Sequence, residues 1–250
     1  MATAKCMNYR TRGRARSNSD RAAGVGTRAP CEAMPMAAPN PFVRATYRLA
    51  AHEPRQLPPD LGREVAFAGR SNAGKSSALN ALCQQNALAR VSKTPGRTQQ
   101  LVFFDVAPPV PPGAPPPAPE AARWLVDLPG YGYAKVPEEL RAHWKQEIDA
   151  YLHRRRSLRG VVLIADIRHP LKEFDRMMLR FCFETNLPCH LLLTKADKLS
   201  RNQAMQALAA VRKGFGDGVQ ASAQVFSSAD GTGVEAAREA VLALLRTPRG

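Results

Sequence analysis

Gly69-Arg70-Ser71-Asn72-Ala73-Gly74-Lys75-Ser76-Ser77 is the stretch that decides the fold of this chain. It has the spacing G-x-x-x-x-G-K-[S/T], in which two glycines let the backbone wrap a polyphosphate and turn successive N–H groups toward it. The Lys75 amine can reach the terminal phosphates, and the Ser76 hydroxyl can ligate Mg²⁺. An apolar strand over 64–68 precedes the loop, and a helix over 75–85 follows it with its positive end toward the same phosphates. The stretch therefore predicts binding of a nucleoside triphosphate.

Strand and helix patterns alternate from about residue 41 onward. Apolar runs predict strands over 64–68, 99–106, 123–127, 161–166, 189–193 and 223–226. Helical spacing predicts helices over 75–85, 138–154, 172–185, 201–213 and 233–245. This alternation indicates an α/β fold of the P-loop NTPase type, with a mostly parallel six-stranded sheet and helices on both faces. Ligands of such folds bind beyond the carboxyl ends of the strands.

Two of the predicted helices carry a clear apolar stripe. In the helix over 138–154 the stripe is Leu140, Trp144, Ile148, Tyr151 and Leu152; in the last helix it is Val234, Ala237, Val241, Leu244 and Leu245. Such a stripe is the face that packs on a core. We therefore interpret Trp144 and Tyr151 as core residues.

The chain has 250 residues, enough for one domain with appendages. Residues 1–40 mix Arg, Ala, Ser, Gly and Pro without apolar periodicity, which predicts a disordered basic N-terminal extension; an organelle transit peptide is the alternative. Residues 41–250 form the predicted nucleotide-binding domain. A Pro-rich insertion over 107–120 has eight prolines between positions 108 and 119, and we expect an extended excursion at a hairpin tip.

The charge balance points to a polyanionic partner. The formal net charge is +15, and residues 1–40 hold seven basic and two acidic side chains, so the excess extends into the folded part. Nucleic acid is the commonest such partner, although an arginine-favouring genome would give the same composition. Five cysteines without a C-x-x-C pair favour a reducing compartment, with no disulfide partner and no zinc site. No apolar run reaches eighteen residues, so no membrane span is expected.

Two further loops follow predicted strands. Asp127-Leu128-Pro129-Gly130 is a D-x-x-G sequence, whose aspartate can hold Mg²⁺ through water and whose glycine N–H can sense the γ-phosphate. Thr194-Lys195-Ala196-Asp197 is a form of the [NT]-K-x-D loop, in which the carboxylate accepts two hydrogen bonds from guanine. Each such bond is worth roughly 1.5–3 kcal/mol, which favours guanine over adenine about hundred- to thousandfold. The stem of Lys195 can cover the purine face.

Two weaker signals complete the set. Phe226-Ser227-Ser228 follows the last strand, where a backbone N–H can bond guanine O6. The segment from Ser92 to Gln99 lies between the first helix and second strand, and a threonine there can close over the γ-phosphate as a switch. Spacing does not choose between Thr94 and Thr98.

The strings GRSNAGKSS, SKTPGRTQ, DLPGYGYA, DIRHP and LLTKADKL occur in this order. Together they resemble the EngB/YsxC (YihA) family of bacterial ribosome-biogenesis GTPases of the translation type, over roughly residues 40–246. The resemblance implies a cytoplasmic, Mg²⁺-dependent GTPase that associates with the large ribosomal subunit and its rRNA during assembly, and a link to normal cell division and septation. It makes Ser76 and Thr98 the Mg²⁺ ligands and gives Phe226–Ser228 the last guanine-loop position. We also expect a monomer.

The expected nucleotide contacts come from five segments. They are Gly69, Arg70, Ser71, Asn72, Ala73, Gly74, Lys75 and Ser76; Gly96, Arg97, Thr98, Gln99 and Gln100; Asp127, Leu128, Pro129 and Gly130; Thr194, Lys195, Ala196 and Asp197; and Phe226, Ser227 and Ser228.

Catalysis of hydrolysis is assigned to Lys75, Asn72 and Thr98. Ras-like enzymes orient the attacking water with a glutamine after D-x-x-G, whereas this chain has Tyr131 there. We therefore expect slow intrinsic turnover, helped by a partner or an ion. Asn72 resembles the phosphate-loop asparagine of related GTPases that bind K⁺, and K⁺ would neutralise developing charge.

Three residues near the site have alternative interpretations. Arg97 and Arg168 could act as arginine fingers, contact RNA or be solvated, and His169 is interpreted as a turn residue. Two rival functions also remain: a small-molecule kinase or ATPase, which the sequence 194–197 disfavours, and an RNA- or septum-binding module in which hydrolysis is incidental.

Overall fold

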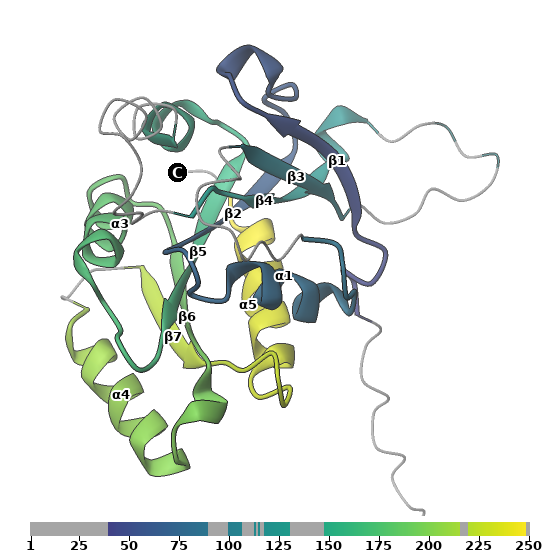
Figure 1. Cartoon of the computed structure of the whole chain (residues 1–250). Helices are drawn as coiled ribbons and strands as arrows, with labels where there is room; N and C mark the ends of the chain where they lie inside the picture. Colours follow the sequence, from purple (N-terminus) through teal and green to yellow (C-terminus); the bar gives the residue numbers. More distant parts are fainter. Residues whose placement is uncertain are drawn as a thin grey trace, which may run out of the picture. The chain divides into compact units, whose positions relative to one another are not determined.

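The computed structural model describes residues 40–89, 100–106, 113, 115, 118–130, 148–215 and 220–248. Seven strands within these residues form one mixed sheet (Figure 1). All of them belong to a single unit, Pro39–Gly250. The strands are β1 (Thr46–Ala51), β2 (Arg63–Gly69), β3 (Leu101–Asp105), β4 (Arg123–Asp127), β5 (Leu158–Asp166), β6 (Cys189–Thr194) and β7 (Ala221–Val225). Their order in the sheet is β1-β3-β4-β2-β5-β6-β7.

The five strands from β4 to β7 in this order are parallel, whereas β3 runs antiparallel to both of its neighbours, β1 and β4. Val102 of β3 pairs with Asp127 of β4, so β3 and β4 form a hairpin, and the Pro-rich residues connect its two strands. The carboxyl ends of the parallel strands therefore share one edge with the beginning of β3. The phosphate loop and the loops after β4, β6 and β7 emerge at this edge.

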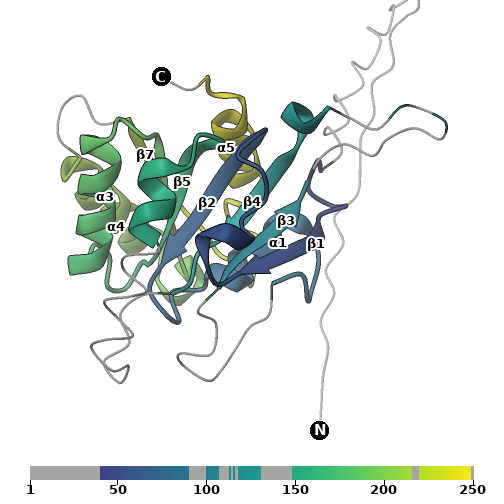
Figure 2. The ribbon, with the colours of Figure 1, turned by 90° about the horizontal axis from the view of Figure 1, so that it is seen from above.

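Strand β1 is the seventh strand, one more than the sequence predicted. It lies at the edge of the sheet, and its burial runs from exposed at Thr46 to buried at Ala51. An edge strand that is mostly exposed needs no apolar alternation, so its sequence, TYRLAA, has no strong strand pattern. Figure 2 shows β1 at the opposite end of the molecule from α3 and α4.

Helices cover both faces of the sheet. The helices are α1 (Lys75–Cys83), α3 (Glu173–Glu184), α4 (Arg201–Lys213) and α5 (Val234–Arg246), together with helical residues 148–154 and the short 3₁₀ helices Pro54–Gln56, Pro119–Ala121 and Ala196–Lys198. Residues of α3, α4 and 148–154 join one hydrophobic cluster, and residues of α1 and α5 join the other. Alternate positions of β5, such as Leu163 and Ile164, belong to opposite clusters, as expected of a strand buried on both sides.

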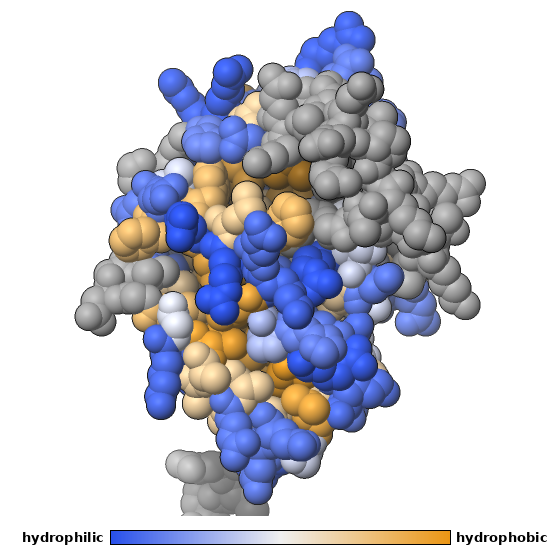
Figure 3. All heavy atoms as spheres, turned by 60° about the vertical axis from the view of Figure 1, so that its left-hand side comes forward, coloured by the Kyte–Doolittle hydropathy of each residue, from blue (hydrophilic) through white to orange (hydrophobic). Residues whose placement is uncertain are grey.

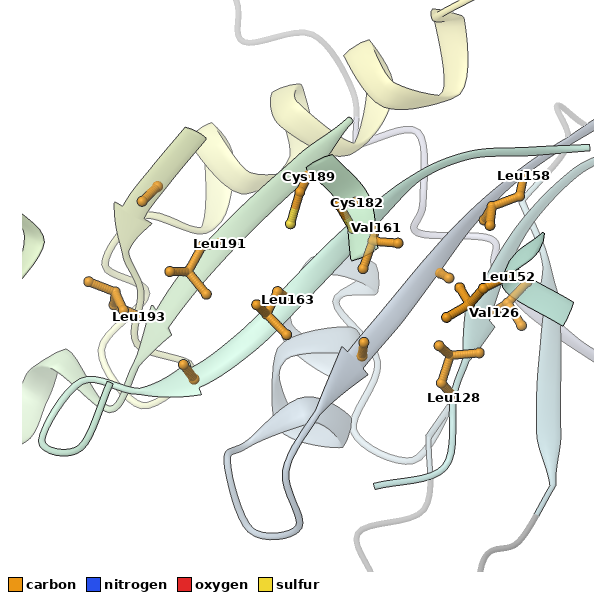
Figure 4. Packing of buried hydrophobic residues seen from close by; sticks show 14 of the residues in the cluster. Val126, Leu128, Leu152, Leu158, Val161, Leu163, Cys182, Cys189, Leu191 and Leu193 are labelled. Carbon is orange, nitrogen blue, oxygen red and sulfur yellow. The ribbon is translucent and has the colours of Figure 1, made fainter. Parts of the chain in front are cut away.

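The core contains the side chains that the apolar stripes predicted, as far as they are described. Tyr151 and Leu152 are buried, and Ile148 packs against them, whereas Leu140 and Trp144 lie outside the described residues. Figure 4 shows Leu152 and Val126 close together, with Leu163, Leu191 and Leu193 continuing the same cluster along β5 and β6.

A buried ionic cluster holds the end of helix 148–154 against the start of β2. Glu64 is fully buried and accepts hydrogen bonds from Tyr151 Oη at 2.7 Å, Arg155 Nη2 at 2.6 Å and Ser157 Oγ at 2.8 Å. Arg155 also donates to the carbonyl of Pro58 at 2.8 Å. Because each charge is paired and hydrogen-bonded, burial of this cluster is tolerated, whereas losing one partner would leave a buried charge alone.

A second buried cation fixes α1. Arg238 of α5 is 4% exposed and donates from Nε to the Leu82 carbonyl at 2.8 Å and from Nη2 to the Ala81 carbonyl at 2.9 Å. These carbonyls belong to the last turn of α1, where a positive charge is favourable. The helix that follows the phosphate loop is thereby held at its far end.

Cys83, Cys182 and Cys189, the cysteines within the described residues, are free and buried. Among the helices that can be described, none is long and apolar enough to cross a bilayer.

Candidate nucleotide-binding site

The phosphate loop connects β2 to α1, as the sequence predicted. Gly74 precedes the helix with φ at 96°, a left-handed conformation that side chains disfavour, and Asn72 also has a positive φ of 60°. The N-cap of α1 is Gly74, which has no side chain with which to cap the N–H groups of the first turn. The loop therefore presents backbone donors at the positive end of a helix, which suits a bound phosphate.

The D-x-x-G loop lies directly against this phosphate loop. Lys75 Nζ forms an ion pair with Asp127 Oδ1, and each of these side chains is 11% exposed. A Cβ added to Gly130 would come within 3.3 Å of the Ser71 backbone nitrogen, a contact tighter than side chains usually make. The Lys75 amine and the Asp127 carboxylate thus lie together, and Ser76 follows Lys75 in the chain; an amine, a carboxylate and a hydroxyl are groups that suit a Mg²⁺–phosphate complex.

The guanine-type loop after β6 is bound to the phosphate loop through two side chains. Lys195 Nζ donates to the carbonyl of Asn72 at 2.6 Å, across 123 positions in the sequence. The hydroxyl of Thr194, which is buried, donates to the carbonyl of Ala73 and lies 3.1 Å from that of Ala165. These two contacts therefore join the loops directly.

Asp197 is held as a carboxylate in that loop. Its Oδ2 lies 2.9 Å from Lys198 Nζ, and its Oδ1 accepts the Ser227 hydroxyl at 2.8 Å. Hydrogen bonds from Lys198 and Ser227 lower the pKa of Asp197 below its ordinary value, so it is ionised at neutral pH. An ionised carboxylate can accept two N–H groups at once, which is what guanine offers.

Ser227 links the last loop to this carboxylate. It is fully buried, and its hydroxyl also accepts the N–H of Ala229 at 3.2 Å. The Phe226 carbonyl accepts the N–H of Ala196 at 3.1 Å, which joins the two loops through their backbones. Ser228 is exposed.

Asp166, at the end of β5, lies between a lysine and an arginine. Its Oδ2 is 2.9 Å from Lys195 Nζ and 2.7 Å from Arg168 Nη2, and its Oδ1 accepts Arg168 Nε at 2.9 Å. Burial alone would raise the pKa of Asp166, but the hydrogen bonds from Arg168 and Lys195 outweigh it and hold the pKa well below the usual range. The N–H of His169 donates to the Asp166 carbonyl at 2.9 Å, which is a turn contact.

Comparison with known proteins places this arrangement in a family. The family model described as 50S ribosome-binding GTPase matches residues 64–195. "Probable GTP-binding protein EngB" of Stenotrophomonas maltophilia (strain K279a) is 63% identical over 199 residues, covering 78% of this chain and 92% of its own. The protein of the same name from Xanthomonas euvesicatoria pv. vesicatoria (strain 85-10) is 57% identical over 206 residues, covering 81% and 92%. The chain belongs to the EngB family of GTP-binding proteins.

Solved structures agree with the EngB-family fold. A crystal structure of a probable GTP-binding protein EngB aligns with a TM-score of 0.54 at 19% identity, over 73% of this chain and 98% of that one. A point variant of Aquifex aeolicus Era bound to GDP·AlF₄⁻ aligns with a TM-score of 0.57 at 19% identity, over 75% of this chain and 57% of that one. The predicted α/β P-loop fold is thereby confirmed, with a mixed sheet.

The described part of the site brings together the phosphate loop, residues 127–130, residues 194–197 and residues 226–228. Gln100, also predicted as a contact, places its side chain against His52 just beyond the end of β1. Gly96, Arg97, Thr98, Gln99 and Tyr131 lie outside the described residues.

Sequence reasoning missed two positioning residues of this EngB-family site. The sequence analysis names Asp166 only within the string DIRHP, and no pattern there indicates its contact with Lys195. A carboxylate at the end of a buried parallel strand, beside a base-reading loop, was the available signal. Ser227 was placed in the guanine loop for its backbone, whereas its side chain contacts Asp197.

Proposed function

We propose that this chain is a Mg²⁺-dependent GTP-binding protein that hydrolyses GTP slowly and acts as a switch in assembly of the large ribosomal subunit. The observation that carries the proposal is the bridge made by Lys195, which contacts the phosphate loop through Asn72 and the end of β5 through Asp166. A base-reading loop and a phosphate loop joined in this way form one continuous site for a guanine nucleotide.

Each part of the nucleotide has assigned residues. Residues 69–76 would hold the phosphates, and residues 194–197 and 226–228 would hold the base. Ser76 and Thr98 would ligate Mg²⁺, with Asp127 acting through water; bound Mg²⁺ neutralises phosphate charge. Lys75, which pairs with Asp127 in this structure, would exchange that carboxylate for phosphate when the nucleotide binds.

The slow rate follows from Tyr131, which has no amide with which to orient the attacking water. Lys75, Asn72 and Thr98 would then provide the catalytic contacts, with K⁺ near Asn72 as a charge-neutralising ion. Equal rates of GTP hydrolysis in KCl and NaCl, with and without ribosomal particles, would contradict a role for K⁺.

The cellular role of the proposed switch is inferred from the family description, 50S ribosome-binding GTPase. We propose a cytoplasmic monomer that contacts rRNA of the large subunit, and an effect on cell division and septation that follows from ribosome assembly. The net charge of +15 supports an RNA contact.

Competition binding tests the nucleotide assignment. Purified protein should bind GDP and GTP at least hundredfold more tightly than ATP, and Asp197→Asn should shift the preference from guanine toward xanthine, because one acceptor becomes a donor. Equal binding of ATP and GTP by the wild type would show that residues 194–197 do not read guanine.

Co-sedimentation with purified 50S subunits tests the switch. Association should differ between GTP and GDP, and Ser76→Ala should remove that difference. A protein that sediments equally with GTP, GDP or no nucleotide is an RNA-binding module and not a switch.

A further inference from the structure

Basic side chains recur every fourth residue along α3. Lys172 at the N-cap and Arg176 and Arg180 within the helix are all exposed, and Arg168 continues the spacing before the helix begins. Residues four apart lie on one face of a helix, with successive positions about 6 Å apart along its axis. Phe183, three residues beyond Arg180, is 53% exposed on the same side. Lys172, Arg176, Arg180 and Phe183 together form what we call the α3 ridge.

The fold makes little use of these side chains. Among the residues that the structure describes, Lys172 and Arg180 have no ion-pair partner. The side chain of Arg176 donates, within the same residues, only to the Leu171 carbonyl, at 2.9 Å. The exposed acids of the helix, Glu173 and Glu184, lie along one margin of the ridge. Figure 3, which turns this side of the molecule forward, shows hydrophilic and hydrophobic patches lying side by side.

The ridge begins next to the proposed base site. Arg168, which precedes the ridge at the same spacing, donates three hydrogen bonds to Asp166, and Lys195 contacts the same carboxylate, so Arg168 shares Asp166 with the loop proposed to read the base. A ligand lying along α3 would therefore end beside the nucleotide.

We propose that the α3 ridge binds the phosphate backbone of an RNA strand, with Phe183 packed against an unpaired base. This proposal rests on the ribosomal function proposed above. A line of cations suits a polyphosphate, whereas the centre of a protein interface is depleted of charge. The guanidinium fork matches phosphate oxygens, and an exposed aromatic ring beside it is a platform for base stacking.

Two variants on the ridge and one elsewhere test the proposal. Lys172→Ala/Arg180→Ala removes the two ridge cations that pair with no described residue, and Phe183→Ala removes the ring. Arg44→Ala/Arg48→Ala is the matched control, because it removes two exposed cations at or near β1, an edge strand, whereas α3 packs against the interior strand β5. Each is measured for binding to purified 50S subunits and to protein-free large-subunit rRNA, over a salt range of about 50–200 mM. GDP affinity and thermal melting check folding.

The ridge double variant should bind both RNA-containing targets about tenfold more weakly near 100 mM salt, and its log–log salt slope should fall by about two. Phe183→Ala should weaken binding with the slope unchanged, because stacking releases no counterions. The control should bind like the wild type, and GDP affinity should be unchanged throughout.

Three results would contradict these statements in distinguishable ways. Wild-type protein that binds GDP but neither 50S subunits nor rRNA would overturn the ribosomal function together with the ridge. Wild-type binding with no difference between the ridge variant and the control would overturn the ridge alone. Loss of 50S binding with free rRNA binding intact would show that the ridge contacts a ribosomal protein, and would overturn the RNA assignment.

Discussion

Replacing Asp166 with asparagine should weaken guanine-nucleotide binding without changing how the base is read. Asp166 Oδ2 lies 2.9 Å from Lys195 Nζ, and the same lysine donates to the Asn72 carbonyl at 2.6 Å. The carboxylate therefore supplies one of two contacts that hold the lysine stem, which under the proposed function would cover the purine. Asparagine keeps an acceptor but loses the charge.

The expected magnitude comes from the lost charge-assisted contact. A hydrogen bond to a charged group contributes roughly 1.5–3 kcal/mol. The side chains of Asp166 and Lys195 are 12% and 31% exposed, so solvent screens part of this energy and the low end applies. About 1.4 kcal/mol corresponds to a tenfold change in Kd.

Competition binding with GDP and IDP gives the assay. Inosine lacks the exocyclic amine, so the ratio of the two affinities reports on base reading by Asp197. Asp166→Asn should weaken both nucleotides about tenfold and leave their ratio unchanged. Arg168→Ala is the control, since it removes the arginine but leaves the contact between Asp166 and Lys195, and it should change Kd less than about threefold.

Three outcomes would refute this reasoning. Wild-type GDP affinity in Asp166→Asn would show that Lys195 is held by Asn72 alone. An equal loss of GDP affinity in Arg168→Ala would show that the arginine, and not the contact between Asp166 and Lys195, causes the effect. A collapse of the GDP-to-IDP ratio would show that Asp166 acts on the guanine edge.

Three other predictions concern stability. Glu64→Gln should lower the free energy of unfolding in urea by about 3–5 kcal/mol, because it removes the charge of the buried carboxylate that accepts two hydrogen bonds from Arg155 and leaves that cation only Asp60, at 3.7 Å. Tyr151→Phe should cost about 2 kcal/mol; equal losses would mean that the cluster behaves as neutral hydrogen bonds. The Asn80 side chain donates to the Ala89 carbonyl at 3.0 Å and accepts the Ala89 N–H at 2.8 Å. Asn80→Ala removes both hydrogen bonds, so the Ala89 amide should lose protection from hydrogen exchange, and an unchanged exchange rate would contradict this. The pKa of Asp166 is lowered by folding, so its contribution to stability is present above its ordinary value of 3.8 and declines as pH falls below that value. The difference in unfolding free energy between wild type and Asp166→Asn should therefore shrink on acidification, and a constant difference would argue against an ionised Asp166.

The regular elements were predictable because both faces of the central strands are apolar and the helices are amphipathic. The helix predicted over 201–213 and the strand predicted over 123–127 have those bounds in the structure. Strand β5 begins at Leu158, three residues before the prediction, because Gly160 breaks the apolar run while Leu158 is still buried. Strand β1 was missed because an exposed edge strand leaves no hydrophobic pattern.

Buried charges were the least predictable part of the core. Glu64, Arg155 and Arg238 are each under 10% exposed, although such residues are normally at the surface. Their burial depends on partners from other elements, such as Tyr151 for Glu64 and the end of α1 for Arg238. Neither composition nor periodicity indicates those pairings.

The sequence by itself determined the phosphate-binding loop, because Gly69, Gly74 and Lys75 act through local backbone freedom and one side chain. It also predicts that Asp197 reads guanine, because one carboxylate can accept two N–H groups. Only the tertiary structure decided that Lys195 contacts Asn72, 123 positions away, and shares Asp166 with Arg168. The physical reason is that parallel strands bring the loops after their carboxyl ends to one edge of the sheet, whereas the register and order of the strands decide which of those loops meet.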